Sequence, residues 1–268
     1  MTRPRRRLRL VALDLDGTTL NPDHALTPKT IEAIRAVTAL GVQVVLASGR
    51  LPHSIVPLAR KLGLEGVHIG LNGGVAFDLA GNLRHKHLLS LEQLTLAHRY
   101  MEAEGLSPMV FGAGGLWASH HAEALDFLHR SGEPLPIPYD PAHLEAITDP
   151  AKMVVVLPPG PRDQTIAGHL EPRVHVVRSA PQFLEIMPPG VTKGVALTEY
   201  LADSGIHKDE VMAIGDSEND SSLLAAAGFG VAMGNAVAVL RDQADALTES
   251  NLEDGVAGAL TRYVLDLR

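Results

Sequence analysis

The sequence predicts an α/β protein in which a core with a parallel sheet is interrupted by an inserted α+β domain. Apolar runs of strand length alternate with helix-like stretches from residue 8 onward, and this alternation resumes after residue 188. Such alternation is typical of parallel sheets flanked by helices. From about residue 85 the pattern changes, and a proline-rich stretch spans residues 134–141. We therefore expect a core formed by residues 1–84 and 188–268, with residues 85–187 as the insert.

The composition excludes several classes of protein. A net charge of −8 at pH 7 argues against a surface that binds nucleic acid. The absence of cysteine excludes disulfides, thiolate metal sites and cysteine nucleophiles. No apolar run approaches the ~18 residues that a membrane span needs, and Asp14 and Asp16 interrupt the apolar stretch that a signal peptide would need. We expect a cytoplasmic protein that binds neither nucleic acid nor membranes, and the sequence leaves its oligomeric state open.

The first predicted strand ends in a pair of aspartates. Residues 8–13 form an apolar run typical of a strand buried on both faces, and Asp14, Asp16 and the turn residue Gly17 follow it. Residues at i and i+2 of an extended backbone point to the same side, so both carboxylates start on one face. Two anions this close repel each other, and one pKa rises unless a cation lies between them. The pair favours a metal-assisted carboxylate nucleophile with an acid/base partner over an acidic surface loop.

The rest of the N-terminal part continues the alternation. We predict, in order, a helix from Thr27–Pro28 to Gly41, a strand at residues 42–47, a helix to Leu62 and a strand at residues 67–69. The second strand ends in Ser48-Gly49-Arg50, where a hydroxyl and a glycine N–H can hold phosphate oxygens, although plain turns also use such tripeptides. A turn is predicted at Asn72-Gly73-Gly74. The strand–helix–strand–helix–strand order indicates that all three strands lie in one parallel sheet.

The insert and the C-terminal part are predicted in the same way. In the insert we expect helices at residues 90–105 and 121–130, and strands at 109–111, 116–117, 152–157, 174–177 and 183–187. The core pattern then resumes with a helix whose start carries Lys193, a cation beside N–H groups that favour anions. A strand at residues 211–214 follows and runs into Gly215-Asp216-Ser217-Glu218-Asn219-Asp220. A short strand at residues 230–233 and a closing helix complete the core.

Three loops that suit phosphate and metal follow predicted parallel strands, after residues 13, 47 and 214. The carboxyl ends of parallel strands meet at one edge of a sheet, where open α/β sheets bind their ligands. We therefore expect these loops to converge. Their acidic residues offer more hard oxygen ligands than one surface can leave unpaired, and this set favours Mg²⁺: Asp14, Asp16, Asp216 and Asp220.

These motifs, in this order and separated by an insert, resemble those of the haloacid dehalogenase (HAD) superfamily, and within it the Cof-like phosphatases with a large α+β cap. Asp14-Leu15-Asp16-Gly17-Thr18 is similar to the first motif, Ser48-Gly49-Arg50 to the second, Lys193 to the third and residues 215–220 to the fourth. Asn72-Gly73-Gly74 and residues 250–257 are also similar to this subgroup. The resemblance implies a Rossmann-like HAD core with a parallel sheet plus an inserted α+β cap domain.

The resemblance also implies a role for each motif residue. Asp14 would attack phosphorus and form an aspartyl-phosphate, while Asp16 would protonate the leaving oxygen and then deprotonate water. Metal ligands would be the side chains of Asp14 and Asp216 and the backbone carbonyl of Asp16, with Asp220 supporting them. The phosphoryl oxygens would be held by the N–H of Leu15 and by Ser48, Gly49, Lys193 and Asn219. The implied activity is Mg²⁺-dependent hydrolysis of a small phosphorylated metabolite, such as a sugar phosphate or a nucleotide.

Other activities use overlapping sets of residues. A dehalogenase needs neither a proton on its leaving group nor Mg²⁺, so Asp16 and the acidic fourth motif argue against it. A phosphomutase or phosphotransferase stays open, because it uses the same residues with a different acceptor. A module that only accepts a phosphoryl group as a signal is disfavoured, because such modules are single compact domains without an insert of about a hundred residues. The sequence does not select the substrate among sugar phosphates, nucleotides and other phosphate esters.

Overall fold

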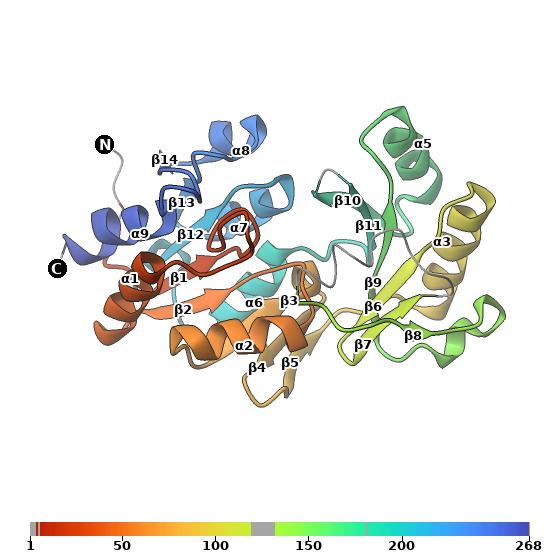
Figure 1. Cartoon of the computed structure of the whole chain (residues 1–268), viewed down its shortest axis with the longest axis horizontal. Coiled ribbons are helices and arrows are strands. Elements are labelled where there is room, and N and C mark those ends of the chain that lie inside the picture. Colours follow the sequence, from red (N-terminus) through yellow and green to blue (C-terminus); the bar gives the residue numbers. More distant parts are fainter. Residues whose placement is uncertain (1–3, 5, 119–131, 181, 268) are drawn as a thin grey trace.

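The computed structural model describes residues 4, 6–118, 132–180 and 182–267. It places the core sheet toward one end of an elongated molecule and the sheet of the insert toward the other end (Figure 1). Leu10–Leu13 (β1) is an internal strand of the core sheet, with β12 and β2 as its neighbours. All four of its side chains are fully buried, as the apolar run predicts. This strand delivers Asp14 to the edge of the sheet.

The core sheet is parallel throughout. In the described part of the chain, its strand order is β14-β13-β12-β1-β2. The strands besides β1 are Gln43–Leu46 (β2), Val211–Gly215 (β12), Phe229–Ala232 (β13) and Ala246–Leu247 (β14). The helices of the core are Pro28–Ala39 (α1), Pro52–Leu62 (α2), Lys193–Ser204 (α6), Ser221–Ala226 (α7), Ala238–Gln243 (α8) and Gly255–Leu260 (α9). Helix α1 packs against α9, and α6 packs against α7. The parallel α/β core predicted from the sequence is confirmed.

The predicted third strand does not lie in the core sheet as expected. Val67–Gly70 (β3) instead pairs antiparallel with Val75–Asp78 (β4), which pairs in turn with Leu83–Lys86 (β5). Only one parallel bridge, between Ala47 and Ile69, connects β3 to the end of β2 among the described residues. The placement of β3 in the parallel sheet was therefore wrong. The turn at residues 71–73 reverses the chain at once, so β3 finds its main partner in β4.

His68 joins β3 to the core sheet through its side chain. The N–H of Leu46 donates to Nδ1 of His68 over 3.2 Å, and the imidazole is fully buried. Nε2 has no hydrogen-bond partner among the described residues. Burial lowers the pKa of His68 from its ordinary 6.5 to about 4, because charging the ring inside the protein is unfavourable. The fold therefore depends on a neutral imidazole here.

The insert has its own sheet and its own core. In the described residues its strand order is β10-β11-β9-β6-β7-β8, with Leu91–Ala103 (α3) and Pro161–Leu170 (α5) as helices. The strands are Met109–Gly112 (β6), Gly115–Ala118 (β7), Ile137–Pro138 (β8), Pro150–Val156 (β9), His175–Ala180 (β10) and Phe183–Met187 (β11). A second cluster of buried apolar residues, including Trp117 and Met153, lies within this part. The inserted α+β cap is confirmed, the helix predicted at residues 121–130 lies outside the described residues, and the domain limits at 85 and 187 stay a prediction.

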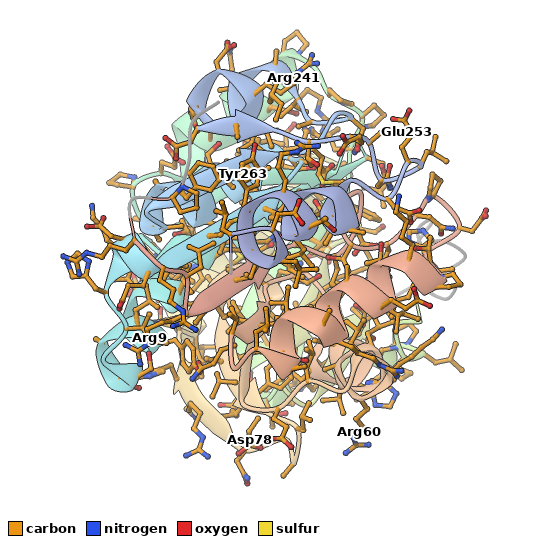
Figure 2. All side chains as sticks on the ribbon, turned by 90° about the vertical axis from the view of Figure 1, so that its left-hand side faces the viewer. Arg9, Arg60, Asp78, Arg241, Glu253 and Tyr263 are labelled. Atoms are coloured by element: carbon orange, nitrogen blue, oxygen red, sulfur yellow. The ribbon has the colours of Figure 1, made fainter. Side chains whose placement is uncertain are left out.

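The far end of the core, viewed from the side opposite the cap, is rimmed by charged side chains (Figure 2). Arg60, Asp78, Arg241 and Glu253 lie on this rim in the view of Figure 2. Tyr263, which is labelled inside this rim, is buried and meets the ring of Phe229 edge-on, with the ring centroids 4.9 Å apart. No helix in the described ranges is long and apolar enough to cross a membrane.

The pH dependence of unfolding should report the neutral state of His68. The unfolded chain binds a proton below pH 6.5, whereas the folded chain does so only near pH 4, so stability falls as the pH falls through this window. We expect His68 to reduce the free energy of unfolding by about 2 kcal/mol between pH 6.5 and 4.5. Denaturant unfolding of His68→Asn, whose Oδ1 can accept the N–H of Leu46, should lack this contribution. The exposed-site control His53→Asn should keep the wild-type slope, and an unchanged slope in His68→Asn would contradict the assignment.

Candidate active site

The loops that follow β1, β2 and β12 meet at one cavity, as their positions after parallel strands predict. Six of the predicted site residues line it: Asp14, Asp16, Ser48, Gly49, Lys193 and Asn219. Leu15, Asp216 and Asp220 are not among the lining residues, although each lies on one of these loops. The structure therefore brings the predicted nucleophile, acid/base and most predicted phosphate ligands to one place. The roles themselves stay predictions.

Lys193 is buried between two carboxylates. Its Nζ lies 2.6 Å from Oδ1 of Asp14 and 2.7 Å from Oδ1 of Asp220. Thr192 caps the helix that begins with Lys193 by accepting the N–H of Val195. Burial alone would lower the pKa of Lys193, but the charges of Asp14 and Asp220 outweigh it and raise this pKa above its ordinary range. Lys193 is thus a permanent cation next to Asp14.

Three carboxylates form an acidic cluster at this lysine. One oxygen from each of Asp14, Asp216 and Asp220 lies within 4.8 Å of the others. Burial and then the charge of Asp220 raise the pKa of Asp14 well above its usual value, and the same two causes raise the pKa of Asp216 to about 6. One ammonium group does not balance three carboxylates, so the cluster favours another cation. Its hard oxygen donors fit a metal site of the kind that Mg²⁺ prefers.

Short-range contacts hold the acidic cluster in place. Oδ2 of Asp220 accepts the N–H groups of Asp216 and Ser217 over 3.0 and 3.1 Å, which closes the loop after β12. The hydroxyl of Thr18 donates to Oδ1 of Asp216 over 2.8 Å. Gly17 has a φ of 84°, and a Cβ there would collide with the carboxylate of Asp216. Glycine is therefore required at this position by both its backbone angle and its close neighbour.

Asp16 lies apart from the acidic cluster, in an ion pair that the sequence did not predict. Arg50 donates from Nε to Oδ2 over 2.7 Å and from Nη2 to Oδ1, a bidentate arrangement. Nδ1 of His24 lies 3.0 Å from Oδ1. Burial raises the pKa of Asp16, but the hydrogen bonds from Arg50 and His24 outweigh it and hold this pKa well below its ordinary value. Asp16 is thus ionised here, and its predicted metal contact, through the backbone carbonyl, stays a prediction.

The cap contributes the opposite wall of the cavity. Its lining residues are Phe111, Glu133, Lys152, Val154, Ser179, Phe183 and Glu185. Lys152 and Glu185 form a buried ion pair over 2.8 Å. They stand in otherwise apolar strands, and that interruption is the sequence signal that could have identified them.

Glu133 connects the cap directly to the core helix α2. Oε1 of Glu133 accepts the N–H of Leu51 over 3.1 Å, and its Oε2 accepts the hydroxyl of Ser54 over 2.8 Å. The N-cap residue of helix α2, Leu51, has no side chain that can accept a hydrogen bond from the first N–H groups of the helix. A carboxylate of the cap domain accepts from the N-terminal end of this helix instead. Burial raises the pKa of Glu133, against the effect of these hydrogen bonds. The cap therefore docks beside the loop that carries Arg50.

Comparisons with known proteins identify the family of this chain. The family described as haloacid dehalogenase-like hydrolase matches residues 11–260. A 5-amino-6-(5-phospho-D-ribitylamino)uracil phosphatase of Bacillus subtilis is 28% identical, with 96% of each chain covered. A phosphoglycolate phosphatase of Methanoculleus marisnigri is 30% identical, covering 96% of this chain and 97% of its own. The crystal structure of a haloacid dehalogenase-like hydrolase from Bacteroides thetaiotaomicron is 30% identical, with a TM-score of 0.84 over 96% of this chain and 99% of that chain. The chain therefore belongs to the haloacid dehalogenase-like hydrolases, as a Cof-like member with a cap.

Proposed function

We propose that this protein is a Mg²⁺-dependent phosphatase that hydrolyses a small phosphorylated metabolite, such as a sugar phosphate or a nucleotide, through an aspartyl-phosphate on Asp14. The observation that carries this proposal is the position of Asp14. Its carboxylate is bonded to Lys193, belongs to the acidic cluster and lines the cavity that Asp16 also lines. The two relatives named above, both phosphatases of small phosphate esters, support the same reaction class.

The proposed metal ligands are the side chains of Asp14 and Asp216 and the carbonyl of Asp16, with Asp220 as a support. Both oxygens of Asp220 already have donors, Lys193 on one side and the loop N–H groups on the other. The donors to Asp216 are the hydroxyl groups of Thr18 and Ser217, which can rotate away more easily than a buried ammonium group or backbone N–H groups can move. Asp14 and Asp216 are therefore the better side-chain ligands. A bound Mg²⁺ supplies positive charge that stabilises the negative charge on the phosphoryl oxygens.

The first half-reaction transfers the phosphoryl group to Asp14. An oxygen of Asp14 attacks phosphorus, the bond from phosphorus to the ester oxygen breaks, and the leaving oxygen takes a proton from Asp16. Lys193 favours the anionic form of Asp14 against burial and the charge of Asp220, which raise the pKa of this carboxyl group, because its ammonium group lies 2.6 Å from the carboxylate. Ser48, Gly49, Lys193 and Asn219 are the proposed donors to the phosphoryl oxygens, together with the N–H of Leu15.

The second half-reaction returns Asp14 to its carboxylate form. Asp16 takes a proton from water, the water oxygen attacks phosphorus, the bond from phosphorus to the Asp14 oxygen breaks, and inorganic phosphate leaves. The ion pair with Arg50 holds Asp16 in the ionised form that this base needs. The acid role in the first half needs a protonated Asp16, so ester binding has to weaken the contact between Arg50 and Asp16.

The test of the reaction class is hydrolysis of p-nitrophenyl phosphate by the full chain. We expect turnover with Mg²⁺, loss of turnover when a chelator removes the metal, and recovery when Mg²⁺ is added back. Measuring nitrophenolate and inorganic phosphate together separates hydrolysis from transfer, because a phosphotransferase releases more nitrophenolate than phosphate. Turnover that survives complete chelation would contradict the metal assignment.

Replacing each aspartate should have a different effect. Asp14→Asn should lower kcat by at least about a hundredfold, equivalent to ~2.7 kcal/mol, because an amide is a poor nucleophile. Asp16→Asn should lower kcat/KM for an alkyl phosphate more than for p-nitrophenyl phosphate, because nitrophenolate leaves without a proton. Asp23→Asn, at an exposed position of the same segment, is the matched control and should behave as wild type. Equal losses for both esters in Asp16→Asn would exclude Asp16 as the acid.

A further inference from the structure

The turn Leu71–Gly73 has no role in the reaction proposed above, yet its backbone is strained at two consecutive residues beside the site. Leu71 and Asn72 have φ values of 53° and 55°, in the left-handed region that residues with side chains rarely adopt. Gly73 follows with a φ of 98°. Such a backbone persists only where its surroundings hold it, and strain of this kind often marks a site with a function.

The backbone of this turn contacts the loops that carry the proposed phosphate ligands. The N–H of Asn72 donates to the carbonyl of Ser48 over 3.0 Å, and the side chain of Asn72 lies against Gly49. A Cβ on Gly73 would collide with the carbonyl of Thr192, which precedes Lys193. The turn therefore packs between the second motif, Ser48-Gly49-Arg50, and the start of α6.

The side chain of Asn72 connects the cap to the fourth motif. Its Nδ2 donates to Oε2 of Glu185, on cap strand β11, over 2.6 Å. Its Oδ1 accepts Nδ2 of Asn219 over 3.0 Å. The other oxygen of Glu185 accepts Nζ of Lys152 over 2.8 Å and the hydroxyl of Ser179 over 2.5 Å. Asn72 and Glu185 are both almost fully buried, so water does not compete for these bonds.

Each hydrogen bond in this chain fixes which end of the next amide donates and which end accepts. An ionised carboxylate only accepts, so Glu185 requires the NH₂ end of Asn72 to face it. The oxygen of Asn72 must then face Asn219 and selects its NH₂ end. Oδ1 of Asn219 is buried without a hydrogen-bond partner among the described residues, so Asn72 alone fixes this amide there.

We propose that Asn72 is a positioning residue that couples the cap to the phosphate site through Glu185, Asn72 and Asn219. This inference rests on the proposed function, in which Asn219 binds the phosphoryl group. An anion binds only the NH₂ end of an amide, so the orientation of Asn219 decides whether it contributes. Asn72 does not line the cavity, so its effect on phosphate is transmitted through Asn219.

The test exchanges the amide and the carboxylate. Glu185→Gln can keep its oxygen toward Lys152 and Ser179, but its NH₂ then opposes the NH₂ of Asn72. Asn72→Asp instead places two carboxylates in contact. In the double variant Asn72→Asp/Glu185→Gln, every donor again faces an acceptor, and the net charge is the same as in the wild type. The readout is the inhibition constant of inorganic phosphate, which has no leaving group to touch the cap, with kcat and KM for p-nitrophenyl phosphate beside it.

We expect each single variant to weaken phosphate binding by about tenfold, the cost of one mismatched buried hydrogen bond. The double variant should recover to within about threefold of wild type. If only the net charge near the site mattered, Glu185→Gln would have the opposite effect, because removing a negative charge should make phosphate bind more tightly. Glu185→Gln with equal or tighter phosphate binding would overturn the proposal, and so would a double variant as weak as the single ones.

Two further variants keep the test informative. Asn82→Asp places a carboxylate against Asp78, which lies on the rim in Figure 2, and should leave phosphate binding unchanged. If Asn72→Asp does not fold, Asn72→Gly keeps the backbone angle and removes the amide, and it should weaken phosphate binding to the same degree. Unchanged phosphate binding in Asn72→Gly would also overturn the proposal. A wild-type chain that hydrolyses no phosphate ester would refute the proposed function instead.

Discussion

The contact of Lys193 with Asp14 and Asp220 is the interaction on which the rest of the site depends. Burying carboxylates side by side is unfavourable, and the raised pKa values of Asp14 and Asp216 express that cost. One ammonium group at 2.6 and 2.7 Å makes the arrangement tolerable without neutralising it. The remaining negative charge favours a further cation at this cluster, which is the place proposed for Mg²⁺. A phosphoryl group, which is itself anionic, can approach Asp14 only when that charge is balanced.

Two carboxylates of the cap, Glu133 and Glu185, connect it to the core at this site. Glu133 satisfies the start of α2, Glu185 binds Asn72, and both side chains line the cavity. These contacts lie next to Arg50 and Asn219, which belong to the second and fourth motifs. A movement of the cap relative to the core would therefore act on the core loops at two places, through Glu133 and through Glu185. The same contacts that close the cavity can set the geometry of the groups that are proposed to bind phosphate.

Local patterns in the sequence predict much of this structure. The strand before Asp14, the start of α1 at the helix N-cap Thr27 and the start of α6 at Lys193 are each predicted from neighbouring residues, and the structure contains all three elements. Contacts between distant residues were not predictable in this way. The pair of Arg50 with Asp16 spans 34 positions and that of Asn72 with Glu185 spans 113, so no local pattern reveals them. The misplacement of β3 has the same origin, because strand pairing depends on the partner as well as on the strand.

The central claim, that Asp14 carries the phosphoryl group, is tested most directly by trapping it. Asp16→Asn removes the base that activates water, so the phosphorylated form should accumulate when this variant reacts with p-nitrophenyl phosphate. Acid quenching during the nitrophenolate burst, digestion and mass spectrometry then locate the phosphoryl group. We expect it on the peptide that contains Asp14, at the carboxylate of that residue. A burst with the phosphoryl group on another side chain would contradict the claim.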